Sequence, residues 1–155
     1  MDPYSADGEL VNIHNAYHQA QYAKVIDFDT SAFSSDNEVP AQLLKLRAKI
    51  ALGQYAEVIQ DVKGKESTPD FAAARLLAEY LKNGKEDVVE KGAQLATKEG
   101  DKNLGVQLLI GTLLGRAGRT EEALALLSKH QGSLDMLVVL ATTYGALLIE
   151  LVSQS

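Results

Sequence analysis

The phrase QYAKVI at residues 21–26 returns as QYAEVI at residues 54–59, and only Lys24 and Glu57 differ between the copies. The copies begin 33 residues apart, at 21 and 54, which is a common period of helical repeats. A helix pair of this length cannot bury its apolar face alone, so successive pairs stack on one another. The phrase therefore predicts an all-α fold of repeated helix pairs, in which the differing position faces solvent.

Two further copies follow in the same register. Apolar residues at helical spacing predict first helices over residues 10–17, 40–52, 71–81 and 104–117. The second helices are predicted to begin at Tyr22, Tyr55, Glu86 and Thr120. The expected start signals are Pro40, Thr68 with Pro69, and Asp101. The expected end signals are Gly53, Gly84 and Gly118.

The repeats fit a tetratricopeptide-like pattern. Tyr55 supplies the aromatic residue that opens a second helix, and Val58 supplies the small apolar residue three positions later. Gly111 fits the small residue at which a first helix crosses its partner. Glu86 and Thr120 replace the aromatic residue in the later copies. We expect an all-α, tetratricopeptide-like superhelix of four antiparallel helix pairs followed by a terminal helix.

Composition excludes several classes of protein. The 155 residues suffice for one domain with a core, and the lack of cysteine excludes disulfides, zinc ribbons and thiol catalysis. A net charge of −6 without a basic run argues against nucleic-acid binding. The acidic, polar start MDPYSADGEL is unlike a secretory signal, so a cytosolic chain is expected.

One stretch, MLVVLATTYGALLI at residues 136–149, is uncharged. A membrane span needs about 20 apolar residues, so we expect a buried helix at this length. A membrane-anchored form that uses this segment is the alternative.

No catalytic or metal-binding pattern is complete. His14 and His18 share a helix face, but a third ligand and an HExxH arrangement are missing. Gly64-Lys65 resembles the end of a phosphate-binding loop, yet Glu66 stands where Ser or Thr should hold magnesium. No G-x-S-x-G nucleophile elbow occurs. We therefore expect no enzymatic activity, no cofactor and no metal.

A concave protein-binding face is the remaining candidate site, because first helices line the concave side of such a superhelix. By register this face should contain Leu10, His14, Tyr17, His18, Leu43, Arg47, Ile50, Ala51, Ala74, Ala78, Leu81, Lys82, Thr112 and Arg116. Tyr17, Arg47 and Arg116 are the first choices as anchors, since Tyr and Arg are frequent binding hot spots. The alternative for each residue is packing against a neighbouring repeat.

Several segments resemble the N-terminal half of the epsilon subunit of coatomer. They are ELVNIHNAY (9–17), the QYAKVI turn, LLKLRAKIALGQYAEVIQDVK (43–63) and AARLLAEYL (73–81), and the resemblance covers residues 9–134. It implies a non-catalytic adaptor in the COPI vesicle coat, acting in retrograde Golgi-to-ER and intra-Golgi transport. It also implies binding to, and stabilisation of, the C-terminal domain of the alpha subunit. The expected location is the cytoplasm, with peripheral association with Golgi membranes and COPI vesicles only through the coat.

The two ends depart from this pattern. Residues 1–8 are expected to be a flexible N-terminus, and residues 135–155 to be a terminal helix unlike the family. Family chains continue through further repeats, so a truncated, alternatively spliced or mispredicted form is expected. The rival function is a generic tetratricopeptide scaffold, such as a chaperone cofactor, which would hold acidic tails with Arg47, Lys82 and Arg116.

Overall fold

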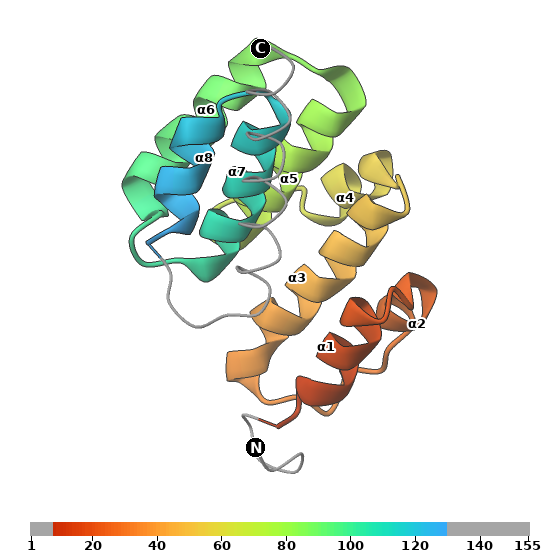
Figure 1. The fold of residues 1–155 in the computed structure, drawn as a ribbon. Coiled ribbons are helices and arrows are strands. Elements are labelled where there is room, and N and C mark those ends of the chain that lie inside the picture. The colour runs from red at the N-terminus through yellow and green to blue at the C-terminus, as the bar shows by residue number, and fades with distance from the viewer. Residues whose placement is uncertain (1–7, 130–155) are drawn as a thin grey trace. The chain divides into compact units, whose positions relative to one another are not determined.

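The computed structural model describes residues 8–129, and this range contains eight α-helices and no strand (Figure 1). The predicted all-α helical repeat is confirmed. The chain divides into two compact units, Met1–Asp61 and Val62–Ser155. The expected terminal helix at 135–155 lies outside the described residues, as do residues 1–7.

The first unit contains two helix pairs. Its helices are α1 (Val11–His18), α2 (Tyr22–Ile26), α3 (Ser35–Ala51) and α4 (Tyr55–Asp61). Helices α1, α2 and α4 all pack on the long helix α3 (Figure 1). The core between α1, α2 and α3 consists of Ile13, Ala16, Val25, Leu44 and Ala48. The rings of Phe28 and Phe33, from the loop before α3, pack against this core. They meet edge to face, with 6.3 Å between the ring centroids.

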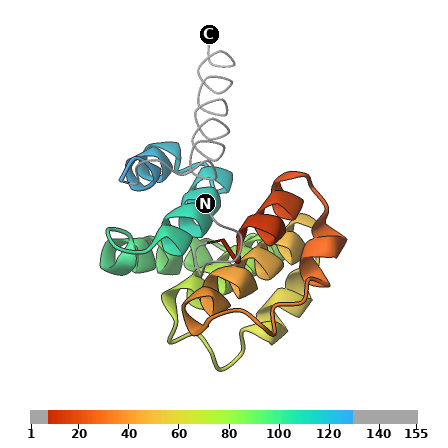
Figure 2. The ribbon, with the colours of Figure 1, turned by 90° about the horizontal axis from the view of Figure 1, so that it is seen from below.

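The second unit contains the other two pairs. Its helices are α5 (Pro69–Asn83), α6 (Glu86–Glu99), α7 (Leu104–Arg116) and α8 (Thr120–Leu127). Helix α7 packs against the other three (Figures 1 and 2) and is buried along most of its length, which fits its largely apolar sequence. A Cβ atom at Gly111 would lie 2.6 Å from Cδ2 of Leu127. Gly111 is therefore the small crossing residue between α7 and α8, as predicted.

The four second helices begin at the residues that the register predicted, Tyr22, Tyr55, Glu86 and Thr120. Three positions into each helix lies a side chain with no exposed surface. These four residues are Val25, Val58, Val89 and Ala123. Lys24 and Glu57, which differ between the two copies of the phrase, are both exposed. The repeated phrase thus records how a second helix packs on its partner.

The turns inside the helix pairs share a left-handed residue two positions before each second helix. Their φ angles are 58° at Ala20, 78° at Gly53, 64° at Gly84 and 80° at Gly118. In three turns the following N–H donates to the carbonyl five residues earlier: Gln21 to Ala16, Gln54 to Lys49 and Arg119 to Leu114. This 6→1 bond is the Schellman helix ending, which favours glycine at the left-handed position. Ala20 is the only residue of the four that carries a Cβ there.

We expect Ala20→Gly to stabilise the protein by about 0.5–1 kcal/mol, because a left-handed L-residue costs about 1–2 kcal/mol and the added freedom of the unfolded chain offsets part of the gain. The midpoint of thermal unfolding should rise by about 2–4 °C. Ala23→Gly, in the exposed face of α2, is the matched control and should destabilise by about 1 kcal/mol. Equal effects of the two substitutions would contradict the strain at Ala20.

The predicted start of α3 at Pro40 was wrong, because α3 begins at Ser35 and Pro40 lies inside it. Pro40 is the sixth residue of α3, so it removes the N–H that would bond to the carbonyl of Asp36, and its ring crowds that carbonyl. The actual start signal is Ser34 in extended conformation, followed by acidic residues in the first turn. The helix is therefore longer at its N-terminus than the proline suggested.

Glu9 ties the start of α3 to the chain segment before α1. Its Oε2 accepts hydrogen bonds of 2.9 Å from Ser34 N–H, from Ser34 Oγ and from Asn37 Nδ2. The bond from the Asn37 side chain, followed by those from Ser34, lowers the pKa of Glu9 below its ordinary value. The ionised carboxylate also suits the positive end of the helix dipole.

The predicted cap at Asp101 was also wrong. The N-cap of α7 is Asn103, whose side-chain oxygen accepts from the N–H of Val106 at 2.9 Å. The amide of Asn103 also donates to Asp70 at 2.9 Å, which links the starts of α7 and α5. Asp101 instead accepts a 2.6 Å hydrogen bond from Lys129. The actual cap thus lies two positions after the predicted one, with only Lys102 between them.

Candidate protein-binding surface

The strongest candidate surface lies in the first unit. His14, Tyr17 and His18 share one face of α1, because residues three and four apart in a helix are neighbours. From α3, the guanidinium carbon of Arg47 lies 4.4 Å from the centre of the Tyr17 ring, a cation–π contact. Tyr22, at the start of α2, meets the Tyr17 ring at 5.6 Å. We call these five residues the aromatic patch.

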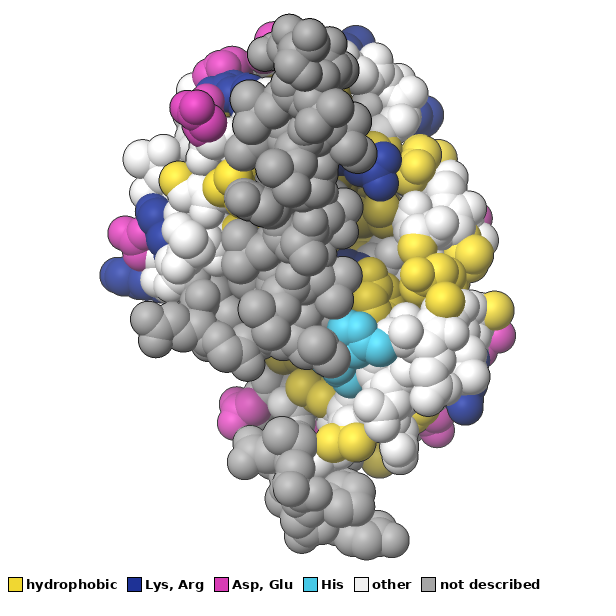
Figure 3. Space-filling view, viewed as in Figure 1, with side chains coloured by type: hydrophobic (Ala, Val, Ile, Leu, Met, Phe, Trp, Pro, Cys, Tyr) yellow, Lys and Arg dark blue, Asp and Glu magenta, His cyan; other side chains and the backbone are white. Residues whose placement is uncertain are grey.

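The chemistry of the aromatic patch suits protein binding. Tyr17 and Arg47 are both half-buried. Arginine presents a planar set of N–H donors that match a carboxylate, and stacking on an aromatic ring restricts its rotamers. The two described histidines form one group on the face seen in Figure 3. The patch therefore combines tyrosine and arginine, which are enriched in binding hot spots, with two histidines.

The histidine pair has the predicted geometry. The His14 and His18 rings lie 4.6 Å apart between centroids, tilted by 55°, and the His18 ring meets Tyr17 at 5.7 Å. Between residues 8 and 129, no group of three His, Cys, Asp or Glu side chains is placed to hold a metal ion.

The other predicted face residues of the first unit differ in exposure. Leu10 and Ile50 are half-buried, Ala51 is exposed, and Leu43 retains 8% of its surface. Leu10 packs against the core of this unit, while Leu43 is itself a core residue. Packing, the alternative weighed for every candidate, accounts for Leu10 and Leu43.

The predicted face residues of the second unit divide in the same way. Ala74 and Ala78 have no exposed surface and belong to the core. Leu81 and Thr112 are half-buried, and the Thr112 hydroxyl donates to the carbonyl of Leu108 at 2.8 Å. Lys82 and Arg116 are exposed. Of the three basic residues of the rival carboxylate clamp, Arg47 belongs to the first unit, and Lys82 and Arg116 belong to the second.

A groove between α5 and α6 was not predicted. It has a volume of about 460 Å³ and two matching walls. The α5 wall consists of Ala72, Arg75, Leu76 and Glu79, and the α6 wall of Lys91, Gln94, Leu95 and Lys98. Each set follows the i, i+3, i+4, i+7 spacing of one helix face. That spacing is visible in the sequence, and pairing the two stripes across the Gly84 turn would have indicated the groove.

The remaining sequence candidates show no further site. Gly64 has a φ of 81° and lies with exposed Lys65 in the loop before α5, so the resemblance to a phosphate-binding loop reflects a turn. Among the described helices none has the length and apolarity that a membrane crossing requires. The uncharged stretch 136–149 lies outside the described residues.

Comparison with known proteins gives one family. Residues 6–142 match the family model described as coatomer epsilon subunit, which is most of the 155-residue chain. The match extends past residue 134, where the sequence pattern of the family was expected to end. Neither the curated proteins nor the solved structures contain a match to this chain.

Proposed function

The chain belongs to the coatomer epsilon subunit family, whose members are subunits of the COPI vesicle coat, and we propose that it binds and stabilises the C-terminal domain of the alpha subunit. In this role it acts in retrograde Golgi-to-ER and intra-Golgi transport as a structural adaptor without catalytic activity. It works in the cytoplasm and reaches Golgi membranes and COPI vesicles peripherally, through the coat. The net charge of −6 also disfavours direct contact with nucleic acid or with an anionic membrane.

The aromatic patch is the observation that supports the alpha subunit as partner. Four of its five members, His14, Tyr17, His18 and Arg47, were predicted as contact residues from the repeat register alone, and the structure brings them together. Arg47 rests on Tyr17, so the two are already ordered before a partner arrives, which reduces the entropy lost on binding. The other exposed or half-buried residues of the predicted face remain proposed contacts, Ile50 and Ala51 in the first unit and Leu81, Lys82, Thr112 and Arg116 in the second.

We expect Arg47→Glu to weaken binding to the alpha-subunit domain at least about 30-fold, or about 2 kcal/mol. The substitution removes the cation of the patch and puts in its place a negative charge, which repels an acidic group of the partner. Isothermal titration calorimetry of the purified chain against that domain measures the change. Circular dichroism should show unchanged helicity, since a cation–π contact at such a site is worth only about 0.5–1 kcal/mol.

Lys24→Glu is the matched control, because it reverses one exposed charge on α2 and copies the natural residue of the second repeat, Glu57. This variant should bind with wild-type affinity. A folded wild-type chain that does not bind the alpha-subunit domain would contradict the proposal. Equal losses in both variants would remove Arg47 from the contact surface.

A further inference from the structure

The α5–α6 groove combines an apolar floor with a charged rim. Ala72, Leu76 and Leu95 are half-buried apolar residues that line it from both helices. Arg75 lies beside Leu76 on the α5 wall, while Lys91 and Lys98 stand one helix turn to either side of Leu95 on the α6 wall. Such a groove between two helices suits the apolar stripe of a third helix.

The carboxylates of the groove are already engaged. Glu79 accepts from Nε of Arg75 at 2.7 Å, and Glu66 accepts from Nη1 of the same side chain. These contacts raise the pKa of Arg75, chiefly through the hydrogen bond to Glu79, so Arg75 stays charged and fixed in place. The α5 wall is therefore an internally paired network.

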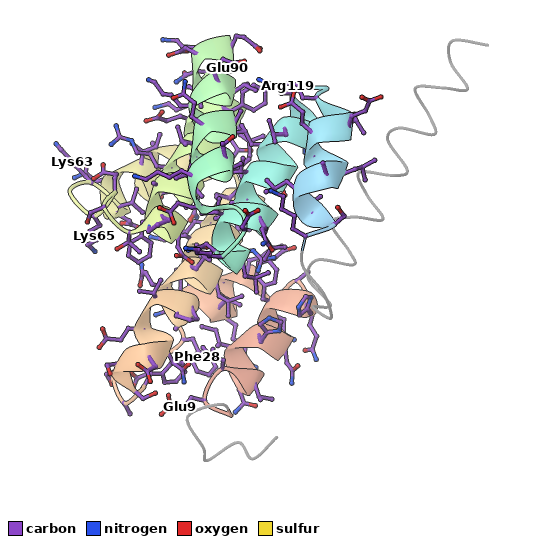
Figure 4. All side chains as sticks on the ribbon, turned by 90° about the vertical axis from the view of Figure 1, so that its left-hand side faces the viewer. Glu9, Phe28, Lys63, Lys65, Glu90 and Arg119 are labelled. Carbon is purple, nitrogen blue, oxygen red and sulfur yellow. The ribbon has the colours of Figure 1, made fainter. Side chains whose placement is uncertain are left out.

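The two lysines of the α6 wall are less strongly paired than Arg75 of the α5 wall. In the described part of the chain, Lys91 forms one ion pair, an exposed contact of 3.6 Å between its Nζ and Oδ2 of Asp87, and a pair of this type contributes little. Lys98 is exposed and forms no ion pair within residues 8–129. Glu90, next to Lys91 in sequence, is held by Arg119 at 2.6 Å (Figure 4). Helix α6 thus presents its two lysines to the groove, while Glu90 pairs with the turn before α8.

We propose that this groove binds an amphipathic helix of a partner protein whose two carboxylates, seven residues apart, pair with Lys91 and Lys98 on either side of an apolar stripe. Seven residues of α6 span about 10.5 Å, and a bound helix matches this distance with acidic residues at i and i+7. Its apolar residues at i+3 and i+4 would contact Leu76 and Leu95. This partner is separate from the one bound by the aromatic patch, and its binding does not depend on the alpha subunit.

A protein partner fits better than a lipid surface. Glu66, Glu79 and Asp87 lie in or beside the groove, and their charges would oppose an extended anionic membrane. A helix can instead place single carboxylates next to the lysines and leave the paired α5 wall undisturbed. The two positive charges at fixed spacing therefore select a segment with matching acidic positions.

The test uses the full chain and a labelled synthetic helix of about 14 residues, with Glu at i and i+7, Leu at i+3 and i+4, and Ala and Gln elsewhere. Fluorescence anisotropy should show saturable binding with a Kd on the order of 100 μM. The same peptide with both Glu replaced by Lys should not bind the wild-type chain. NMR shifts on binding should centre on Leu76 and Leu95.

The double variant Lys91→Glu and Lys98→Glu should lose at least about tenfold in affinity for the acidic peptide. The control Lys24→Glu and Lys85→Glu makes the same change of charge at two exposed lysines outside the groove and should bind as the wild type does. Absence of saturable binding, equal binding of the Lys peptide, or equal loss in the control pair would each overturn the proposal. The peptide comparison holds even where a variant does not fold.

Discussion

We expect Gly111→Val to lower the free energy of unfolding by about 3 kcal/mol, because α7 and α8 cross at this residue without room for a side chain. A Cβ there would lie 2.6 Å from Cδ2, 2.7 Å from Cγ and 3.2 Å from Cδ1 of Leu127. The first two distances require a shift, and Leu127 is fully buried, so it has no free space to move into. Urea denaturation followed by circular dichroism measures the loss.

Removing the opposing side chain should restore part of the stability. Leu127→Ala alone should cost about 2–5 kcal/mol, and the double variant Gly111→Val with Leu127→Ala should cost less than the sum by at least about 1 kcal/mol. Thr112→Val, the next residue of α7, is the control for adding Val to this helix and should change stability by less than about 1 kcal/mol. Strictly additive losses would show that the two residues are not in contact.

The fold could be predicted from the sequence largely because one rule is repeated. An apolar residue three positions after Tyr22 and Tyr55 is visible in the sequence, and the same offset from Glu86 and Thr120 finds the equivalent buried residues. The three-residue spacing is kept in the copies that begin with Glu86 and Thr120, which lack the aromatic residue. The register of the repeats is therefore set by the buried residue three positions into the second helix and not by an aromatic ring at its start. Tyr22 and Tyr55 are themselves only half-buried.

The errors concern capping groups that come from elsewhere in the chain. Pro40 is a plausible helix start in isolation, and only the hydrogen bonds from Ser34 and Asn37 to Glu9, far earlier in the sequence, reveal the actual one. Asn103 likewise caps α7 in place of Asp101, because its side-chain oxygen accepts from Val106 N–H while its amide donates to Asp70 on another helix. Local propensity cannot show such partners, since they depend on tertiary packing.

The sequence also could not show which residues of the candidate binding face are buried. Ala74 and Ala78 lie on the helical stripe assigned to the concave face, yet they are core residues, because small side chains allow neighbouring helices to approach them. Gln107 is the opposite case: a polar residue that is buried and donates to the carbonyl of Gly100 at 2.6 Å, with Oε1 unpartnered among the described residues. A polar residue in a helix gives no sign of such a position.

The repeated phrase itself provides the second large effect. Val58→Asp should cost at least about 3–5 kcal/mol at neutral pH, because Val58 has no exposed surface and an aspartate there would be a buried, unpaired charge. This is a large fraction of the roughly 5–15 kcal/mol that stabilises a typical domain. Thermal unfolding by circular dichroism should show a lower midpoint and reduced helicity.

The pH dependence of this loss distinguishes charge from shape. Burial raises the pKa of the new carboxyl in the folded state above its unfolded value, so the folded state tolerates it at low pH and loses stability as pH rises through that raised pKa. Val58→Asn, which has no titrating group, should destabilise without this dependence. The double variant Lys24→Glu and Glu57→Lys exchanges the two residues that differ between QYAKVI and QYAEVI. It should change the free energy of unfolding by less than about 0.5 kcal/mol, because both side chains are exposed. A large effect of that exchange, or a pH-independent loss in Val58→Asp, would mean that the phrase is repeated for a reason other than the packing of its valine.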